Sequence, residues 1–239
     1  MPKNGNKYRI ISILAPLLYN YFNKTEKTLL ISSTLLIIIS FLLFDRNNYL
    51  SLFASLIGIS SLLLSAKGNP FGQLLMVIFS LMYGIISFTF AYYGEMITYL
   101  GMTLPMSVFS SISWIRHPYN KNEVKINRIN KIEILLMFLL SLIVTYIFYL
   151  ILKYLNTNHL FFSMVSITTS FLAVYLSFRR STYFTLAYAC NDLVLIVLWI
   201  LASIENIQYI SVVICFIVFF FNDLYGFVNW KRIERRQNI

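Results

Sequence analysis

Long apolar runs dominate this chain, and short polar or charged segments separate them. Eight of the runs come close to the roughly 20 residues that a helix needs to cross a hydrocarbon core of about 30 Å. The pattern predicts an all-α integral membrane protein with a basic N-terminal segment at residues 1–27 and a basic tail at residues 230–239. The predicted spans are residues 28–44, 49–66, 70–92, 96–115, 132–152, 160–178, 182–202 and 208–229.

The composition supports the same conclusion. Hydrophobic residues make up 59% of the chain and charged residues 12%, whereas a soluble domain has about 45–50% and about 25%. The mean hydropathy is +0.73. The first apolar run begins too late for a signal peptide and is followed by Asp45, Arg46 and another apolar run, so we interpret it as a span.

The positive charges lie on one side of the predicted membrane. With the N-terminus in the cytoplasm and alternating spans, all but two of the 19 Lys and Arg residues fall in cytoplasmic segments, the exceptions being Arg46 and Lys153. This asymmetry predicts a multi-pass protein of the cell membrane with both termini cytoplasmic. Because the net charge of +10 is scattered over short segments, no nucleic acid partner is expected. The segment from Arg116 to Lys131 is expected to be a solvated loop.

The cysteines and histidines give little sign of metal or redox chemistry. Cys190 and Cys215 lie within predicted spans and are expected to be buried thiols. His117 and His159 lie at helix ends on opposite sides of the membrane, and no Cys or carboxylate is spaced to join them. We expect no metal site and no cofactor.

A stripe of polar side chains follows one face of the last span. Asn222, Tyr225 and Asn229 are spaced i, i+3 and i+7, and Trp230 stands at the inner end of the stripe. Polar groups on a helix in lipid must face other protein or a cavity. The stripe is therefore either hydrogen-bonding contact between helices or the wall of a binding cavity, and the neighbouring span favours the cavity.

That neighbouring span has a matching stripe. Tyr188, Asp192 and Trp199 share a face, with Asn191 beside them, and Asp192 lies near the membrane midplane at a depth similar to that of Asn222. Aromatic rings with amides and a carboxylate suit a flat cationic ring that carries hydroxyls. Further candidate lining residues are Gln73, Tyr83, Thr103, Met106, Ser163, Ser166 and Ser170.

The two halves of the chain end their last spans with a similar sequence. The fourth span ends with Trp114 and Arg116, and the eighth ends with Trp230 and Arg232. The similarity is consistent with a parallel repeat of spans 2–4 and 6–8 joined by a linker span. Trp and Arg also mark the boundary of any membrane helix, so both explanations stay open. In the fourth span, Gly101 and Pro105 indicate a hinge or a plain kink.

Three stretches from different spans carry a family signal: Phe221–Trp230 (FNDLYGFVNW), Tyr93–Met106 (YGEMITYLGMTLPM) and Cys190–Trp199 (CNDLVLIVLW). They resemble PnuC-type vitamin transporters over about residues 28–237. The resemblance implies a SWEET-like 3+1+3 fold with an extra N-terminal helix. It also implies uptake of nicotinamide riboside for NAD synthesis by facilitated diffusion, with trapping by a cytoplasmic riboside kinase. A homo-oligomer is compatible with the sequence.

The resemblance also implies site residues. Asn222, Tyr225, Asn229 and Trp230 match the family pattern Asn-x-x-Tyr-x-x-x-Asn-Trp, which implies a role in substrate binding. Many members carry a tryptophan pair near the start of the seventh span, where this chain reads STYFTLAY over residues 181–188. Thiamine and riboflavin therefore stay as alternative substrates.

Two other classes of function are compatible with parts of the sequence. Asp192 and Asp223 could form the dyad of an intramembrane aspartyl protease. The Gly-x-Gly-Asp motif of such proteases is absent, and the expected depths of the two aspartates differ too much for a dyad. A scaffold or receptor subunit would leave the Asn222 stripe unexplained. The sequence therefore favours a transporter over an enzyme.

Overall fold

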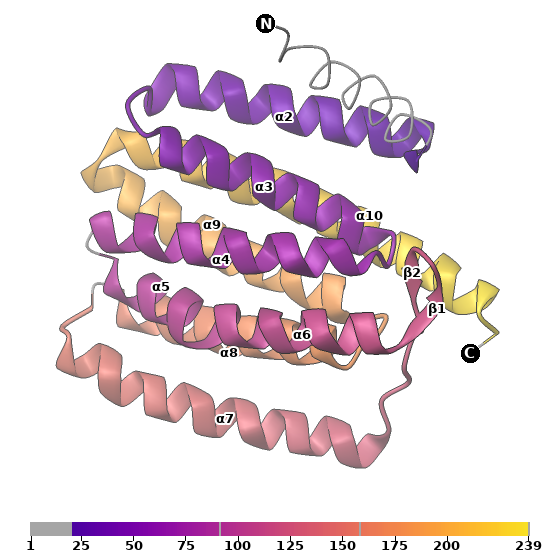
Figure 1. Cartoon of the computed structure of the whole chain (residues 1–239). Helices are drawn as coiled ribbons and strands as arrows, with labels where there is room; N and C mark the ends of the chain where they lie inside the picture. Colours follow the sequence, from indigo (N-terminus) through magenta and orange to yellow (C-terminus); the bar gives the residue numbers. More distant parts are fainter. Residues whose placement is uncertain (1–20, 91, 158, 239) are drawn as a thin grey trace, which may run out of the picture.

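Membrane-length helices run side by side through the computed structural model, which describes residues 21–90, 92–157 and 159–238 (Figure 1). Within these residues, 7 helices are long and apolar enough to cross a membrane. They are α2 (Lys24–Phe44), α3 (Tyr49–Ala66), α4 (Pro70–Thr89), α7 (Lys131–Tyr154), α8 (Leu160–Phe178), α9 (Phe184–Glu205) and α10 (Ile210–Arg236). A short 3₁₀ turn, η2 (Ile207–Tyr209), directly precedes α10. The prediction of an all-α membrane fold is confirmed.

The fourth predicted span is a helix in three parts. It consists of α5 (Tyr93–Ile97), the π-helical segment η1 (Thr98–Thr103) and α6 (Leu104–Arg116). Pro105 lies in the first turn of α6, where it has no N–H to give to a regular α-helical ladder. Wide π turns within helices are rare and occur often at functional sites. The irregularity coincides with the Gly101 and Pro105 positions.

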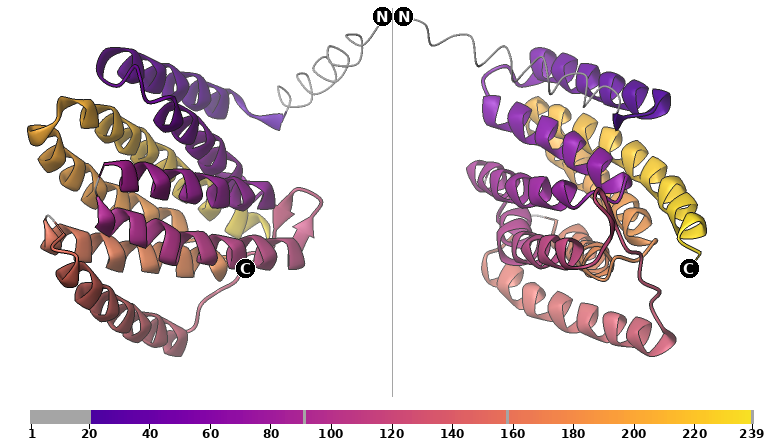
Figure 2. Two further views of the ribbon diagram at one scale, coloured as in Figure 1. Left: turned by 60° about the vertical axis from the view of Figure 1, so that its left-hand side comes forward. Right: turned by 45° about the vertical axis from the view of Figure 1, so that its right-hand side comes forward.

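The helices form two layers. In Figure 1, α3, α4 and α6 lie in front and α10, α9 and α8 behind, and Figure 2 shows the same layers from two further sides. Helix α2 covers one edge, where it packs on α3 and α10, and α7 covers the other edge against α8. The outer faces of α2 and α7 are rich in exposed Leu and Ile, the surface that lipid would cover.

Helices α2 and α10 extend furthest beyond their predicted bounds. Helix α2 begins at Lys24, four residues before the predicted start at residue 28, because Asn23 and Glu26 form a reciprocal capping box. Helix α10 continues through the predicted tail to Arg236. These end turns contain polar and basic residues, so the length of the apolar run did not predict that they are helical.

The segment between the two halves of the chain is a packed hairpin. Strand β1 (Pro118–Asn120) pairs with β2 (Glu123–Val124), and Val124 and Ile126 are buried. The side chain of Gln237 binds both: its Nε2 donates to the Val124 carbonyl at 3.0 Å, and its Oε1 accepts from the Ile126 N–H at 2.9 Å. The expectation of a solvated loop holds for residues 116–122, which are exposed. It does not hold for Val124 and Ile126, because the end of α10 supplies partners for their backbone.

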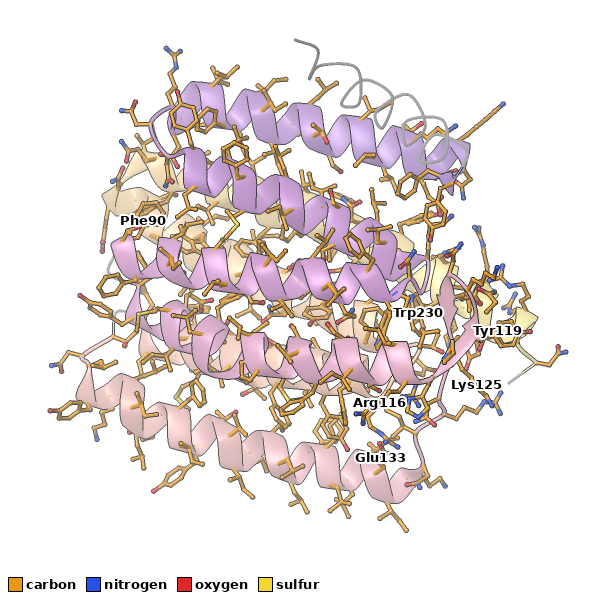
Figure 3. The ribbon with its side chains drawn as sticks, viewed as in Figure 1. Phe90, Arg116, Tyr119, Lys125, Glu133 and Trp230 are labelled. Carbon is orange, nitrogen blue, oxygen red and sulfur yellow. The ribbon has the colours of Figure 1, made fainter. Side chains whose placement is uncertain are left out.

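Charge is concentrated at the end of the bundle that carries the hairpin, which we call the basic end. Ion pairs join Lys67 to Glu26, Arg179 to Glu133 and Arg236 to Glu123 there. Figure 3 shows Arg116, Lys125 and Glu133 at this end and Phe90 at the other. The positive-inside rule predicts that the basic end faces the cytoplasm.

Two buried tryptophans tie the layers together at the basic end. Trp114 of α6 donates its Nε1–H to the Ser177 carbonyl at 2.8 Å. Trp230 of α10 donates in the same way to the Ser65 carbonyl at 2.8 Å. Both indole rings are 0% exposed, so a location at the lipid interface does not explain them.

The two bonds are related as a repeat would relate them. Ser65 and Ser177 are the penultimate residues of α3 and α8, which open spans 2–4 and 6–8. Each tryptophan closes one set of three spans and binds the first helix of the other set. Gln73 lies between them, since its Nε2 donates to Ser65 Oγ at 3.2 Å and its Oε1 accepts from Ser177 Oγ at 3.1 Å.

We expect Trp114→Phe and Trp230→Phe to destabilise the protein to a similar extent. Each change removes one buried hydrogen bond from an indole N–H, a loss of about 0.5–1.5 kcal/mol, although the Ser65 and Ser177 carbonyls each still accept from a backbone N–H. The measurement is thermal unfolding in detergent. Phe221→Leu, at a ring that is 58% exposed on α10, is the control and should leave the unfolding temperature nearly unchanged. A large loss for one tryptophan and none for the other would show that the two bonds are not equivalent.

Candidate functional site

A small cavity lies between the two layers near the middle of the bundle. Its volume is about 20 Å³, which leaves room for about one water molecule. The walls come from both layers and combine aromatic rings with polar side chains. The lining residues are Gly58, Leu62, Met76, Phe79, Tyr99, Thr103, Ser170, Tyr188, Asn191, Asp192, Phe216, Phe219 and Asp223.

One face of α9 forms the polar wall. Tyr188, Asn191 and Asp192 are spaced i, i+3 and i+4, so helical geometry places them together, and all three are buried and line the cavity. Asn191 is held by two hydroxyl groups of α8, because its Oδ1 accepts from Thr169 at 2.8 Å and from Ser170 at 2.9 Å. Its amide nitrogen is the group that is left to meet a ligand.

Asp223 of α10 completes this wall. Asp192 and Asp223 are both buried and line the same small cavity, so their carboxyl groups lie close together. The expectation that their depths differ too much for contact is wrong. Because α10 continues to Arg236, Asp223 lies deeper in the bundle than a span ending at residue 229 would place it.

The stripe on α10 faces α2 instead of the cavity. Asn222 donates through Nδ2 to Ser33 Oγ at 2.9 Å, and Tyr225 donates through its hydroxyl to Glu26 Oε1 at 3.0 Å. Glu26 is 1% exposed and also binds Lys67. These contacts anchor the N-terminal helix to the rest of the bundle.

The part of the stripe nearest the basic end hydrogen-bonds to the last turn of α3. Asn229 donates to the Ala66 carbonyl at 2.8 Å, beside the bond from Trp230 to Ser65. Carbonyl groups in the last turn of a helix have no partner within it, and these side chains supply one. The residues share one face as the spacing predicted, but that face packs against α2 and α3.

Aromatic rings close the cavity toward the basic end. Phe184 packs edge-on against Trp230 and Trp114, with ring centroids 4.7 and 5.7 Å apart. Gln73 lies in the same cluster through its bonds to Ser65 and Ser177. The structure therefore places Gln73 and Trp230 in a closure beneath the cavity instead of in its wall.

A second aromatic cluster closes the opposite end. Trp199 is 0% exposed and packs against Tyr92 at 4.8 Å and Tyr209 at 5.5 Å between centroids. Tyr83 links this cluster to Tyr99 in the cavity wall, with centroids 4.4 Å apart. Trp199 therefore belongs to the second closure, and the site is occluded at both ends.

The sequence reading missed two residues of the fourth span. Tyr99 lines the cavity from η1, and Glu95, which is 1% exposed, lies one turn before it. Thr103 follows one turn later, and its buried Oγ1 has no hydrogen-bond partner among the described residues. The spacing i, i+4 and i+8 of Glu95, Tyr99 and Thr103 is a polar stripe that the sequence offered.

We expect Asn222→Ala to lower stability and to leave ligand affinity in place. The change removes the bond to Ser33 inside a buried interface, at a cost of about 1–3 kcal/mol. Ser33→Ala removes the same bond from the other side, so a double-mutant cycle on unfolding in detergent should show coupling between the two. Full stability with lost binding would instead support the binding role that the family pattern implies for Asn222.

Comparisons with known proteins give a consistent result. A family model described as nicotinamide mononucleotide transporter matches residues 48–232. The nicotinamide riboside transporter PnuC of Neisseria mucosa is 23% identical over 201 residues, which are 82% of this chain and 76% of that protein. A crystal structure of the vitamin B3 transporter PnuC superposes with a TM-score of 0.79 at 22% identity and covers 90% of this chain and 94% of that one. The superposition shows a shared fold.

Proposed function

The chain belongs to the nicotinamide mononucleotide transporter family, and from this premise we propose that it carries nicotinamide riboside into the cell by facilitated diffusion. The family is one of transporters, so the protease alternative is set aside although Asp192 and Asp223 lie close together. The observation that carries the proposal is the occluded cavity between the layers, with a carboxyl pair, an amide and aromatic rings in its walls.

The chemistry of the walls favours the riboside over the mononucleotide. Two Asp residues line the cavity and, among the residues that the structure describes, no Lys or Arg does. A phosphate group calls for cationic partners and would be repelled by carboxylates. The riboside has no phosphate and carries a positive pyridinium ring, which carboxyl groups attract. Thiamine also carries a cationic ring and stays the nearer alternative, whereas riboflavin is neutral.

Each part of the riboside has a matching group in the wall. Tyr99 and Tyr188 offer ring faces to the pyridinium, an attraction of about 0.5–2 kcal/mol. The carboxyl groups of Asp192 and Asp223 attract the positive charge of the pyridinium ring. Asn191 and the Thr103 hydroxyl suit the carboxamide and the ribose hydroxyls. In this proposal, Asn222, Tyr225 and Asn229 act through the position of α10 and not by touching the ligand.

The small volume of the cavity fits a transport cycle. Sites for molecules of this size are usually about 300–1,000 Å³, so the layers must separate to admit the riboside. A parallel repeat of α3, α4 and α6 with α8, α9 and α10, rocking about the central site, would open one closure at a time. The equivalent tryptophan bonds support the repeat, and η1 offers a hinge beside the cavity.

The same charge pattern explains how passive transport could accumulate the vitamin. If the basic end is cytoplasmic, a riboside kinase on that side adds a phosphate to the arriving substrate. The product then carries negative charge that the carboxyl-lined cavity disfavours. It stays in the cell for NAD synthesis, and the concentration gradient of the unmodified riboside is maintained.

Purified protein in liposomes that enclose a riboside kinase and ATP should accumulate labelled nicotinamide riboside. Without the kinase, the internal concentration should only equilibrate with the outside. Labelled nicotinamide mononucleotide and riboflavin should stay at the level of protein-free liposomes. Equal background uptake of every compound would contradict transport, and uptake of thiamine in excess of the riboside, in liposomes with the kinase for each, would reassign the substrate.

A further inference from the structure

We propose that the Asp192–Asp223 pair is the charge-selecting subsite of the cavity, which holds one shared proton when empty and exchanges it for the positive ring of the ligand. The inference rests on the proposed function and deepens it, because it assigns the preference for a cation to two named residues. It also gives binding a measurable proton balance.

The placement of the pair favours a shared proton. Asp192 and Asp223 are 4% and 3% exposed, and both line a cavity of about 20 Å³, so two carboxyl groups lie close together in a small buried space. Two carboxylates that are in contact in a medium of low dielectric repel each other strongly. A single proton between them removes this repulsion, so the empty pair carries one negative charge instead of two.

Within the described residues, no cationic side chain pairs with the remaining negative charge. The ion pairs found in the described part of the chain involve Glu26, Glu133, Glu234 and Glu123, and neither aspartate. Helices α3, α4 and α8 contribute only Gly, Leu, Met, Phe and Ser to the wall. The titratable groups that face the pair, directly or through Tyr99, are Tyr99, Tyr188, Cys190, Cys215 and Glu95, and none of these is cationic.

An independent feature of the wall points to a ligand at this place. Thr103 is 3% exposed, lines the same cavity, and its Oγ1 has no partner among the described residues. Buried polar groups nearly always have a hydrogen-bond partner, so an exception needs an explanation. A ligand oxygen beside a cationic ring would satisfy Thr103 and the carboxyl pair at the same time.

The exchange keeps the charge of the site constant. A positive ring enters, the shared proton leaves to solvent, and the pair plus its occupant has the same net charge before and after. Burial of charge is costly, and because the net charge is the same in both states, the layers can close on the site at a similar cost with or without the ligand. A neutral ligand leaves the proton in place and gains nothing from the second carboxylate.

The wild-type protein in nanodiscs provides the first test. Titration calorimetry is run with nicotinamide riboside and with its neutral reduced form, in buffers of different ionisation enthalpy. We expect the cation to release about one proton, and its affinity to fall by up to about tenfold per pH unit as the solution is acidified from about pH 8 to about pH 5. The neutral form should release no proton and bind with the same affinity throughout.

Variants locate the proton. The double change Asp192→Asn and Asp223→Asn keeps the size of both side chains, and it should abolish proton release and the preference for the cation while the neutral form still binds. Glu95→Gln removes another buried carboxyl group near Tyr99 and should retain the release. Release that survives the double change, or that disappears with Glu95→Gln, would assign the proton elsewhere.

The outcomes separate the two proposals. Binding and uptake of the riboside without proton release, at an affinity that is independent of pH, would overturn the subsite and leave the transport function in place. No binding of either form at any pH would contradict the transport function itself. If the double variant fails to bind the neutral form, the comparison of the two ligands on the wild-type protein still decides the matter.

Discussion

The Trp114–Ser177 and Trp230–Ser65 hydrogen bonds hold this bundle together at the point where its two layers must meet. In the interior of a membrane protein no water is available to satisfy a donor or a carbonyl group, so each indole must bond to protein. Each indole N–H donates to a carbonyl group in the last turn of the helix that begins the other half of the chain. Gln73 joins both acceptor residues, and Phe184 fills the space between the rings. Together they form the closure on which the central cavity rests.

Helix α10 makes two different kinds of contact, because its buried polar side chains also require hydrogen-bond partners. Asn222 and Tyr225 use one face to bind α2, and Asp223, one residue from Asn222, points into the cavity with Asp192. Most polar groups of the stripe are satisfied by protein, whereas the cavity wall keeps a carboxyl pair without a cation and an unpartnered Thr103 hydroxyl. Other buried polar atoms, such as the Tyr83 hydroxyl and the Trp199 indole N–H, also have no partner among the described residues. The feature that marks the cavity wall is the pair of buried carboxyl groups that line it.

The sequence predicted the spans well because lipid thickness fixes helix length, and it predicted which residues share a face because the helical period is constant. It did not predict which neighbour each face meets. The stripe at Asn222 packs on α2 because Ser33 and Glu26 stand opposite it, and no local pattern reports a contact so distant in the chain. The hairpin at Val124 was missed for the same reason, since Gln237 supplies its partners. Asp223 was placed too shallow because charged residues conceal the last turns of α10.

Helix α2 also restricts how the bundle can open. It is tied to α10 through Asn222 and Tyr225, and to the end of α3 through the ion pair of Glu26 with Lys67. Helices α3 and α10 come from different layers, so these contacts clamp the layers together along one edge. On the other edge, α7 packs against α8. The end of α8 is also tied to α6, because Trp114 donates to the Ser177 carbonyl, Ser113 donates to the Phe178 carbonyl, and Arg180 contacts Ser113 and His117. Both edges of the basic end are therefore held by several polar contacts, and the layers can separate there only if one of these two sets breaks.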